Sequence, residues 1–141
     1  MVLGINMEIK LIPKEDLRDF WKIQKQYLKK YSFDCVRKDY SKNKNLYVGC
    51  YKQQELIGIA HGFVKKNMVI LSGIAVKHEY WKKGIGAKLL SFFEKQAKKT
   101  GKKKITIGAA NFPIDVVGFY EKSGYKVVKR YKKYTIVEKE I

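Results

Sequence analysis

The sequence predicts an α/β fold with a mixed, mostly antiparallel central sheet of about seven strands, flanked by about four helices. Three observations support this prediction. First, short segments that are continuously apolar or alternate apolar and polar residues are typical of strands, and they recur at 7–12, 46–51, 56–64, 68–76, 104–110, 125–130 and 134–140. Second, the segments 13–28 and 84–100 carry apolar residues at helical spacing. Third, only short turns separate the strands between residues 46 and 76, which favours an antiparallel meander.

Length and composition indicate one domain. With 141 residues, of which 45% are hydrophobic, the chain can bury a core, so we expect residues 1–141 to form a single domain. Met7 offers a second start, so residues 1–6 could be an N-terminal extension. No apolar run approaches the ~20 residues of a membrane-spanning helix, and the apolar start is too short for a signal peptide. We therefore expect a cytoplasmic protein that does not enter a membrane.

The chain is strongly basic. It has 31 Lys and Arg residues against 13 Asp and Glu residues, a formal net charge of +18. Such a charge attracts anionic ligands, whether an anionic cofactor or a nucleic acid. The lysines are spread along the whole chain, however, which is more typical of a solvated surface than of a nucleic-acid-binding patch. Nucleic acid is therefore not the favoured partner.

The cysteines and histidines do not form a metal-binding pattern. Cys35 and Cys50 are not in a C-x-x-C arrangement, and the two histidines are scattered. No metal is predicted, and both thiols are expected to be buried.

Residues 7–45 predict a strand and two helices. Pro13 is expected to end the strand and open a helix, with Glu15 and Asp16 near its start, where negative charge is favoured. Leu17, Phe20, Trp21, Gln24 and Leu28 would form one face of this helix. The polar and aromatic segment 31–45 could hold a short second helix.

The most informative stretch begins at the strand 68–76. A basic connector follows, then Gly84 and Gly86, and then a helix expected to run to Thr100 and to stop at Gly101. Glycines let a ligand approach the backbone, and the first amides of a helix can bind an anion. Three positive side chains lie in or near the loop: Lys82, Lys83 and Lys88. The stretch therefore predicts a site for a phosphorylated cofactor.

Two common phosphate-binding loops do not match this stretch. A Walker loop requires Lys and then Ser or Thr after its last glycine, whereas Ala87 follows Gly86. A dinucleotide-binding loop requires a third glycine at the position of Leu89. A tight turn with solvated lysines would explain the pattern without any ligand.

The segment VKHEYWKKGIGAKLL, from Val76 to Leu90, resembles the acetyl-coenzyme A loop Q/R-x-x-G-x-G/A of the GNAT superfamily of N-acetyltransferases. The one departure is Trp81, where Gln or Arg is usual. The resemblance implies a GNAT-like sheet, acetyl-CoA as co-substrate, and transfer of an acetyl group to a primary amine. The backbone of the strand would bind pantetheine and the loop amides would bind pyrophosphate. The implied cofactor-binding residues here are Ile74, Ala75, Val76, Trp81, Lys82, Lys83, Gly84, Ile85, Gly86 and Ala87.

A second segment, NFPIDVVGFYEKSGY, from Asn111 to Tyr125, resembles the family pattern N-x-x-A-x-x-F/L-Y-E-K-x-G-F. The resemblance implies that Asn111 binds pantetheine and that Tyr120 binds the cofactor and acts as the general acid. A phenol of pKa ~10 is protonated at pH 7 and can donate to a thiolate of pKa ~8.5. The alternatives are that Asn111 is a turn residue and that Tyr120 is a packed aromatic.

Several glycines and one proline carry structural expectations. Gly73, inside a strand, is expected to mark a bulge or a close approach of backbones. Pro113 is expected to start a short helix at 111–113 that has Asp115 in its first turn. Within this helix, close packing would explain Gly118.

No general base is evident. His61 shares a strand face with Ile57, Ile59 and Phe63, which favours a core histidine over a base. The register at which some family members carry a glutamate is apolar here, near Ile70.

The favoured interpretation is an acetyl-CoA-dependent N-acetyltransferase with Tyr120 as its catalytic residue. A non-catalytic basic module that binds nucleic acid or an acidic partner is the alternative. The acceptor, a small-molecule or peptide amine, and the oligomeric state, a monomer or a homodimer, stay open.

Overall fold

The computed structural model describes residues 2–4, 6–111 and 114–141. Its strands are β1 (Val2–Gly4), β2 (Met7–Leu11), β3 (Tyr47–Lys52), β4 (Glu55–Lys65), β5 (Met68–Val76), β6 (Lys104–Ala110), β7 (Lys126–Arg130) and β8 (Tyr134–Glu140). Its α-helices are α1 (Leu17–Tyr27), α2 (Phe33–Asn43), α3 (Ile85–Lys99) and α4 (Val117–Lys122). Short 3-10 turns lie at Lys14–Asp16, Lys44–Leu46 and His78–Tyr80.

Among the described residues the strands form one sheet in the order β1-β2-β3-β4-β5-β6-β8-β7. Neighbouring strands are antiparallel except β5 and β6, which are parallel. The predicted mixed, mostly antiparallel sheet is confirmed. The strand β1 lies in the segment 1–6, which the sequence suggested could be an N-terminal extension. It pairs with β2 at the edge of the sheet.

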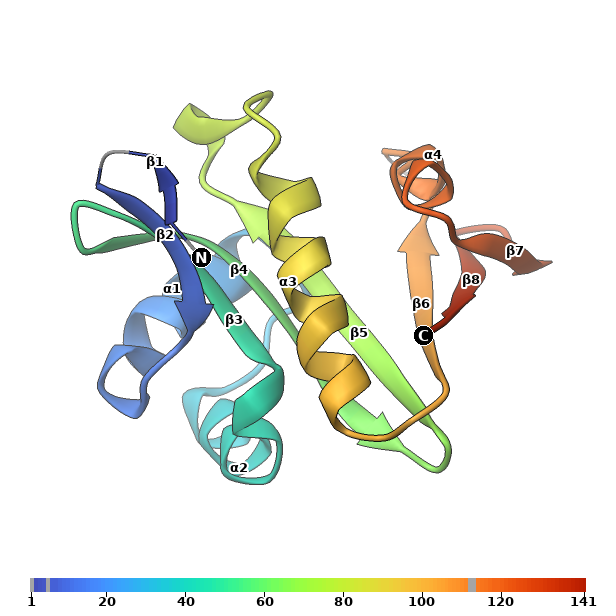
Figure 1. Ribbon diagram of the computed structural model, residues 1–141, viewed down its shortest axis with the longest axis horizontal. Helices are drawn as coiled ribbons and strands as arrows, with labels where there is room; N and C mark the ends of the chain where they lie inside the picture. The colour runs from blue at the N-terminus through green and yellow to red at the C-terminus, as the bar shows by residue number, and fades with distance from the viewer. Residues whose placement is uncertain (1, 5, 112–113) are drawn as a thin grey trace.

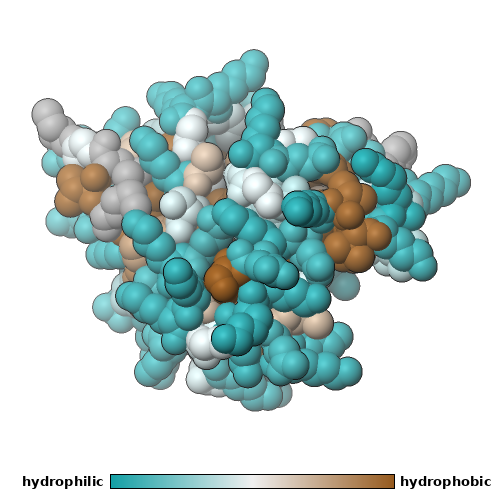
Figure 2. Space-filling view, turned by 45° about the vertical axis from the view of Figure 1, so that its right-hand side comes forward, coloured by the Kyte–Doolittle hydropathy of each residue, from teal (hydrophilic) through white to brown (hydrophobic). Residues whose placement is uncertain are grey.

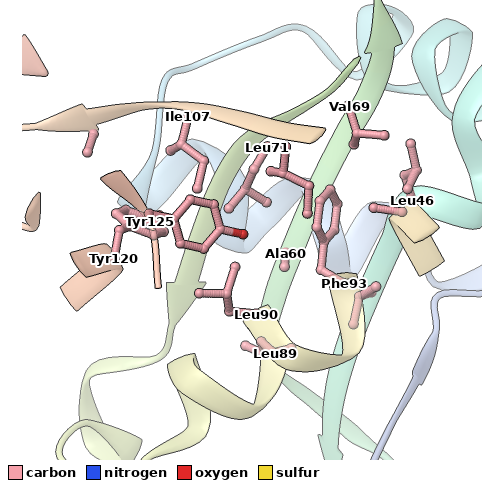
Figure 3. Packing of buried hydrophobic residues seen from close by; sticks show 14 of the residues in the cluster. Leu46, Ala60, Val69, Leu71, Leu89, Leu90, Phe93, Ile107, Tyr120 and Tyr125 are labelled. Atoms are coloured by element: carbon pink, nitrogen blue, oxygen red, sulfur yellow. The ribbon is translucent and has the colours of Figure 1, made fainter. Parts of the chain in front are cut away.

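Helices cover both faces of the sheet, with α3 on one face and α1 and α2 on the other (Figure 1). The apolar stripe of α3, which includes Leu89, Leu90 and Phe93, packs on the first face in the cluster of Figure 3. On the second face, Leu17, Phe20 and Ile23 of α1 belong to a separate cluster. The predicted amphipathic helices are therefore the two layers that bury the sheet.

A bulge changes which side chains of β4 share a face. Between Cys50 and Tyr51 the register of β3 against β4 shifts by one residue, at Ile57. As a result Ile57 packs on the α3 face, whereas Ile59 packs on the α1 face with the ring of His61, which contacts Phe20. The prediction that Ile57 lies on the same face as His61 is wrong, because alternation is interrupted at the bulge.

A second bulge lies in β5. His61 pairs with Gly73 and Gly62 pairs with Leu71, so Ser72 is the extra residue. A Cβ on Gly73 would lie 2.8 Å from Leu28 Cδ1, and one on Gly62 would lie 2.1 Å from the carbonyl oxygen of Ile70. The bulge expected at Gly73 is therefore present beside it, at Ser72, whereas the close atoms at Gly73 belong to the Leu28 side chain and the close backbone approach is at Gly62.

Beyond this bulge β5 and β6 separate. Their parallel pairing runs from Met68 and Lys104 to Leu71 and Ile107 and then stops. In Figure 1 the two strands lie close at one end and diverge toward the other, where α4 follows β6. The C-terminal ends of two neighbouring strands are thus held apart.

Glycines mark the helix ends as the sequence predicts. Gly84 precedes α3 with φ +77°, and Gly101 follows its end with φ +81°. Left-handed conformations of this kind favour glycine. Gly124 after α4 has φ +94°.

Two predicted helix starts are wrong. Pro13 precedes a 3-10 turn, and α1 begins only at Leu17. Phe112 and Pro113 lie outside the described residues, but α4 begins at Val117, so Asp115 precedes the helix instead of lying in its first turn. Its Oδ1 accepts a hydrogen bond of 2.9 Å from the amide of Val117, which competes with continuation of the helix toward its N-terminus.

No helix in the described ranges is long and apolar enough to cross a membrane.

Candidate active site

The connector between β5 and α3 presents main-chain amides at the start of a helix. Lys82 has φ +62° and Gly84 has φ +77°, so the chain turns sharply before Ile85. Among the described residues no side chain caps the N-terminus of α3. Its first amides therefore lack the acceptors that later residues find within the helix, and the helix dipole adds positive potential there.

The space in front of this loop suits a bound group. A Cβ on Gly84 would meet no described atom within 4 Å, whereas one on Gly86 would lie 3.6 Å from Phe119 Cζ. The backbone at Gly84 is therefore open to an approaching ligand. Lys82 and Lys83 are exposed beside it, and together with the uncapped amides they fit an anionic ligand such as a diphosphate.

Trp81 has a structural contact that the sequence did not predict. Its indole Nε1 donates a hydrogen bond of 2.6 Å to the carbonyl oxygen of Val76, at the end of β5. The ring lies 4.5 Å from that of His78, centroid to centroid, and the side chain is half exposed. Trp81 thus ties the connector to the strand, a role that the usual Gln or Arg would fill differently.

The predicted strand residues lie on the edge of β5 that faces the separation. Ile74, Ala75 and Val76 pair with β4 on one side. On the other side the pairing with β6 has already ended at Leu71. The outer backbone groups of this segment are therefore not used by the β5–β6 ladder.

Tyr120 differs from the other buried tyrosines of the described chain. The hydroxyls of Tyr47, Tyr51 and Tyr125 each donate a hydrogen bond to a carboxylate. The side chain of Tyr120 is 6% exposed and packs against Phe119 and Tyr125 at 5.1 and 5.8 Å between ring centroids, but its hydroxyl has no partner among the described residues. Figure 3 shows it beside Tyr125 at one end of the apolar cluster. Burial raises the pKa of Tyr120 to about 12.

Asn111 joins β6 to the β7–β8 hairpin. Its Nδ2 donates to the carbonyl oxygen of Tyr131 at 3.0 Å and to Thr135 Oγ1 at 2.9 Å. Its Oδ1 is buried and has no partner in the described part of the chain. The amide nitrogen is therefore used inside the protein, and only the oxygen is left to accept a further hydrogen bond.

A cavity lies on the opposite face of the sheet. This cavity, named here the α1–α2 pocket, has a volume of about 260 Å³. Its lining residues are Gln24, Tyr31, Cys35, Val36, Asp39, Tyr47, His61, Phe63 and Ser72. His61 is buried there, and desolvation lowers its pKa to about 4. Of this lining the sequence singled out only the segment 31–45, which is polar and aromatic and at which the family resemblance implies a wall of the acceptor site. The other walls come from several elements.

The structure brings two of the predicted segments together. The loop and α4 lie near each other through Gly86 and Phe119. Cys35 is exposed and Cys50 buried, so one of the two expected buried thiols is at the surface. Within the described ranges no three His, Cys, Asp or Glu side chains group closely enough to hold a metal ion.

Comparison with known proteins identifies the family to which this chain belongs. The model of the acetyltransferase (GNAT) family matches residues 10–125. No protein of curated function matches the sequence.

Solved structures share the whole fold. Ard1 from Thermoplasma volcanium superposes with a TM-score of 0.84 at 12% identity, over 97% of this chain and 99% of that one. The PaiA N-acetyltransferase of Thermoplasma acidophilum, in complex with coenzyme A, has a TM-score of 0.73 at 26% identity, over 97% and 100% of the two chains. The ribosomal-protein-S18-alanine N-acetyltransferase of Escherichia coli has a TM-score of 0.76 at 16% identity, over 94% and 90%.

Proposed function

Because the chain belongs to the GNAT family and is an acetyltransferase, we propose that it transfers the acetyl group of acetyl-CoA to a primary amine. One observation carries the proposal. An open, uncapped helix start at Gly84 directly follows a strand whose outer edge is released from its neighbour beyond Leu71. The first feature suits a diphosphate and the second an extended amide-containing arm. The similar PaiA enzyme, crystallised with coenzyme A, supports the choice of cofactor.

The residues that would hold the cofactor follow from these two features. Amides from Lys82 to Ala87 would bind the diphosphate, whereas the Trp81 amide donates to the carbonyl oxygen of His78 at 3.1 Å. Each hydrogen bond from an amide to a charged group is worth ~1.5–3 kcal/mol. Backbone groups of Ile74, Ala75 and Val76 would bind the pantetheine arm, along with the free Oδ1 of Asn111. The thioester supplies an activated acetyl group.

Tyr120 is proposed as the general acid. Its hydroxyl has no partner among the described residues, and burial of the side chain raises its pKa to about 12, so the phenolic oxygen carries its proton at neutral pH. The hydroxyl would donate this proton to the sulfur that leaves. A hydroxyl already bonded to a carboxylate, as in Tyr125, would be a poorer donor.

The amine must be neutral when it attacks, and no residue is assigned as its base. His61 is buried, and its pKa of about 4 makes it a weak base at neutral pH. Water or an amine that is neutral at the working pH would meet this requirement.

The two free cysteines are compatible with a reducing compartment, and we propose that the enzyme acts in the cytoplasm.

The proposal is tested first by cofactor binding. Equilibrium dialysis should show retention of CoA, and Gly84→Ala should weaken it, because a left-handed alanine costs ~1–2 kcal/mol and its Cβ would enter the open space. Gly101→Ala is the matched control. Gly101 also has a left-handed φ and no described atom within 4 Å of its Cβ position, but it lies at the other end of α3.

The second measurement is release of free thiol from acetyl-CoA over a panel of amines. We expect release that depends on the amine. Absence of CoA retention at millimolar concentration would overturn the proposed function, and so would an equal loss of binding in Gly84→Ala and Gly101→Ala.

A further inference from the structure

The α1–α2 pocket is too small for a large ligand, and its mainly apolar lining contains a few polar groups. Its volume of about 260 Å³ lies below the ~300–1,000 Å³ of sites for drug-sized molecules. It therefore admits a small molecule or one end of a longer one.

The charge of the pocket contrasts with that of the protein. The chain carries 31 Lys and Arg residues, and hydrophilic side chains dominate the face in Figure 2. None of the described residues that line the pocket is a Lys or an Arg, and Asp39 is its one carboxylate. In a molecule of net charge +18, this pocket is a local site suited to a cation.

Two buried polar atoms of the lining lack partners. Gln24 is fully buried and its Nε2 donates to the carbonyl oxygen of Lys29, but its Oε1 has no hydrogen bond within the described chain. His61 is 6% exposed, and its Nδ1 is likewise unpartnered. Buried polar groups in native proteins are normally paired, and Gln24 Oε1 can only accept a hydrogen bond, so this atom at a cavity indicates a ligand with donors.

Asp39 has capacity left for a ligand. Its Oδ2 accepts a hydrogen bond from the Tyr47 hydroxyl and its Oδ1 accepts one of 3.1 Å from Asn43 Nδ2. An ionised carboxylate has about four acceptor positions, so further hydrogen bonds can be accepted. The tyrosine and asparagine hold the carboxylate in place without neutralising its charge.

The pocket reaches the place where the strands part. Ser72, the bulged residue of β5, lines it. The preceding residue, Leu71, is the last that pairs with β6. A molecule in the pocket would therefore extend toward the start of the segment Ile74–Val76, which the proposed function assigns to the pantetheine arm.

We propose that the α1–α2 pocket binds the non-reacting end of the acceptor, that this end is a second ammonium group held by Asp39 and Gln24 Oε1, and that the acceptor is therefore a compact diamine. The proposal rests on the proposed function for the reaction itself. Asp39 and Gln24 act here as specificity residues and take no part in the chemical step.

Three amines of equal chain length separate this proposal from others: pentane-1,5-diamine, pentylamine and 5-aminopentanoate. Their distal ends are cationic, apolar and anionic. Thiol release should give kcat/KM for the diamine about 10- to 100-fold above that for pentylamine, the range expected for a charge-assisted hydrogen bond. The anionic amine should be the poorest of the three.

Asp39→Asn should bring the ratio of kcat/KM for pentane-1,5-diamine to that for pentylamine close to one. The matched control is Asp16→Asn, because Asp16 also accepts a tyrosine hydroxyl, that of Tyr51 at 2.8 Å, but does not line the pocket. The control should keep the wild-type preference.

A second readout needs no variant at Asp39. Cys35 is exposed and lines the pocket, whereas Cys50 is buried and burial raises its pKa to about 11. Alkylation by iodoacetamide should therefore report on Cys35, and pentane-1,5-diamine should slow it more than pentylamine does, in protein loaded with CoA.

The outcomes distinguish the two proposals. If CoA is retained, four results would overturn the assignment of the pocket alone. They are equal kcat/KM for the three amines, a preference for the anionic amine, no turnover or protection by any of the three, and a preference for the diamine that Asp39→Asn leaves intact. Failure to retain CoA would instead overturn the proposed function.

Discussion

At the scale of single residues, the partners of the buried tyrosines separate structural from chemical roles. Tyr47, Tyr51 and Tyr125 donate to Asp39, Asp16 and Glu94, and these bonds and burial raise the pKa of each tyrosine. Lys139 also reaches the Glu94 carboxylate, at 3.2 Å. Such networks fix the packing of strands against helices. Tyr120 is buried like the others, but its hydroxyl has no partner in the part of the chain that the structure describes, and a proton donor requires such a hydroxyl.

Replacement of Tyr120 by Phe should therefore leave CoA affinity nearly unchanged and lower kcat by ~10²–10⁴-fold, the usual contribution of a general acid. Thiol release and equilibrium dialysis measure the two quantities. Tyr131→Phe serves as the control, because the side chain of Tyr131 is 41% exposed. Unchanged turnover in Tyr120→Phe would show that the hydroxyl has no part in the reaction.

At the scale of secondary-structure elements, glycines made three helix boundaries predictable. Gly84, Gly101 and Gly124 all adopt the left-handed conformation expected beside helices. The start of α4 was not predictable from Pro113, because a hydrogen bond from the Val117 amide to Asp115 sets it, and a side-chain contact of this kind is not coded by periodicity. The bulge in β4 likewise interrupts an alternation that the sequence alone leaves intact, whereas the bulge in β5 lies beside Gly73, where the sequence predicted one.

The expectation that close packing explains Gly118 is wrong. Gly118 lies in α4, it is exposed, and a Cβ there would meet no described atom within 4 Å. Alanine at this position should therefore raise the free energy of unfolding by ~0.5–1 kcal/mol, because glycine is costly inside a helix. Urea denaturation measures the change.

The same variant reveals whether the open space at Gly118 is used. If Gly118→Ala is stabilising and also weakens CoA retention, a ligand passes close to this backbone. If Gly118→Ala instead lowers the free energy of unfolding, the conclusion that a Cβ at this position has free space around it would be wrong.

At the scale of the whole molecule, the fold class followed from periodicity, but the α1–α2 pocket did not. Gln24, Asp39, Tyr47 and His61 come from four elements, α1, α2, β3 and β4. Spacing within one segment cannot bring such residues together. The loop at Gly84 was predictable for the opposite reason, since its strand, turn and helix are consecutive in the chain.

Burial of His61 should make the protein sensitive to acid. Its folded-state pKa is lowered to about 4 from 6.5, so the unfolded chain takes up a proton at a higher pH than the folded chain does. The contribution of His61 to the free energy of unfolding is present above pH 6.5. It should be lost as the pH falls toward 4, which lowers the free energy of unfolding by roughly 3 kcal/mol. Urea denaturation at pH 7 and pH 4.5 measures the loss.

His61→Gln should show a smaller loss between these two pH values, while the control variant His78→Gln, at an exposed position, should behave as wild type. Equal pH dependence in the wild type and His61→Gln would show that other groups control unfolding in acid.

The short parallel ladder between β5 and β6 has a mechanical consequence. The C-terminal third of the chain is joined to the rest of the sheet through the pairs from Met68–Lys104 to Leu71–Ile107. A strand pairing this short should act as a hinge. A molecule bound between the diverging ends of β5 and β6 should restrict the hinge motion. Amide hydrogen exchange of β6 and β8 should accordingly slow when CoA is added, and unaltered exchange would mean that the two halves are already rigidly coupled.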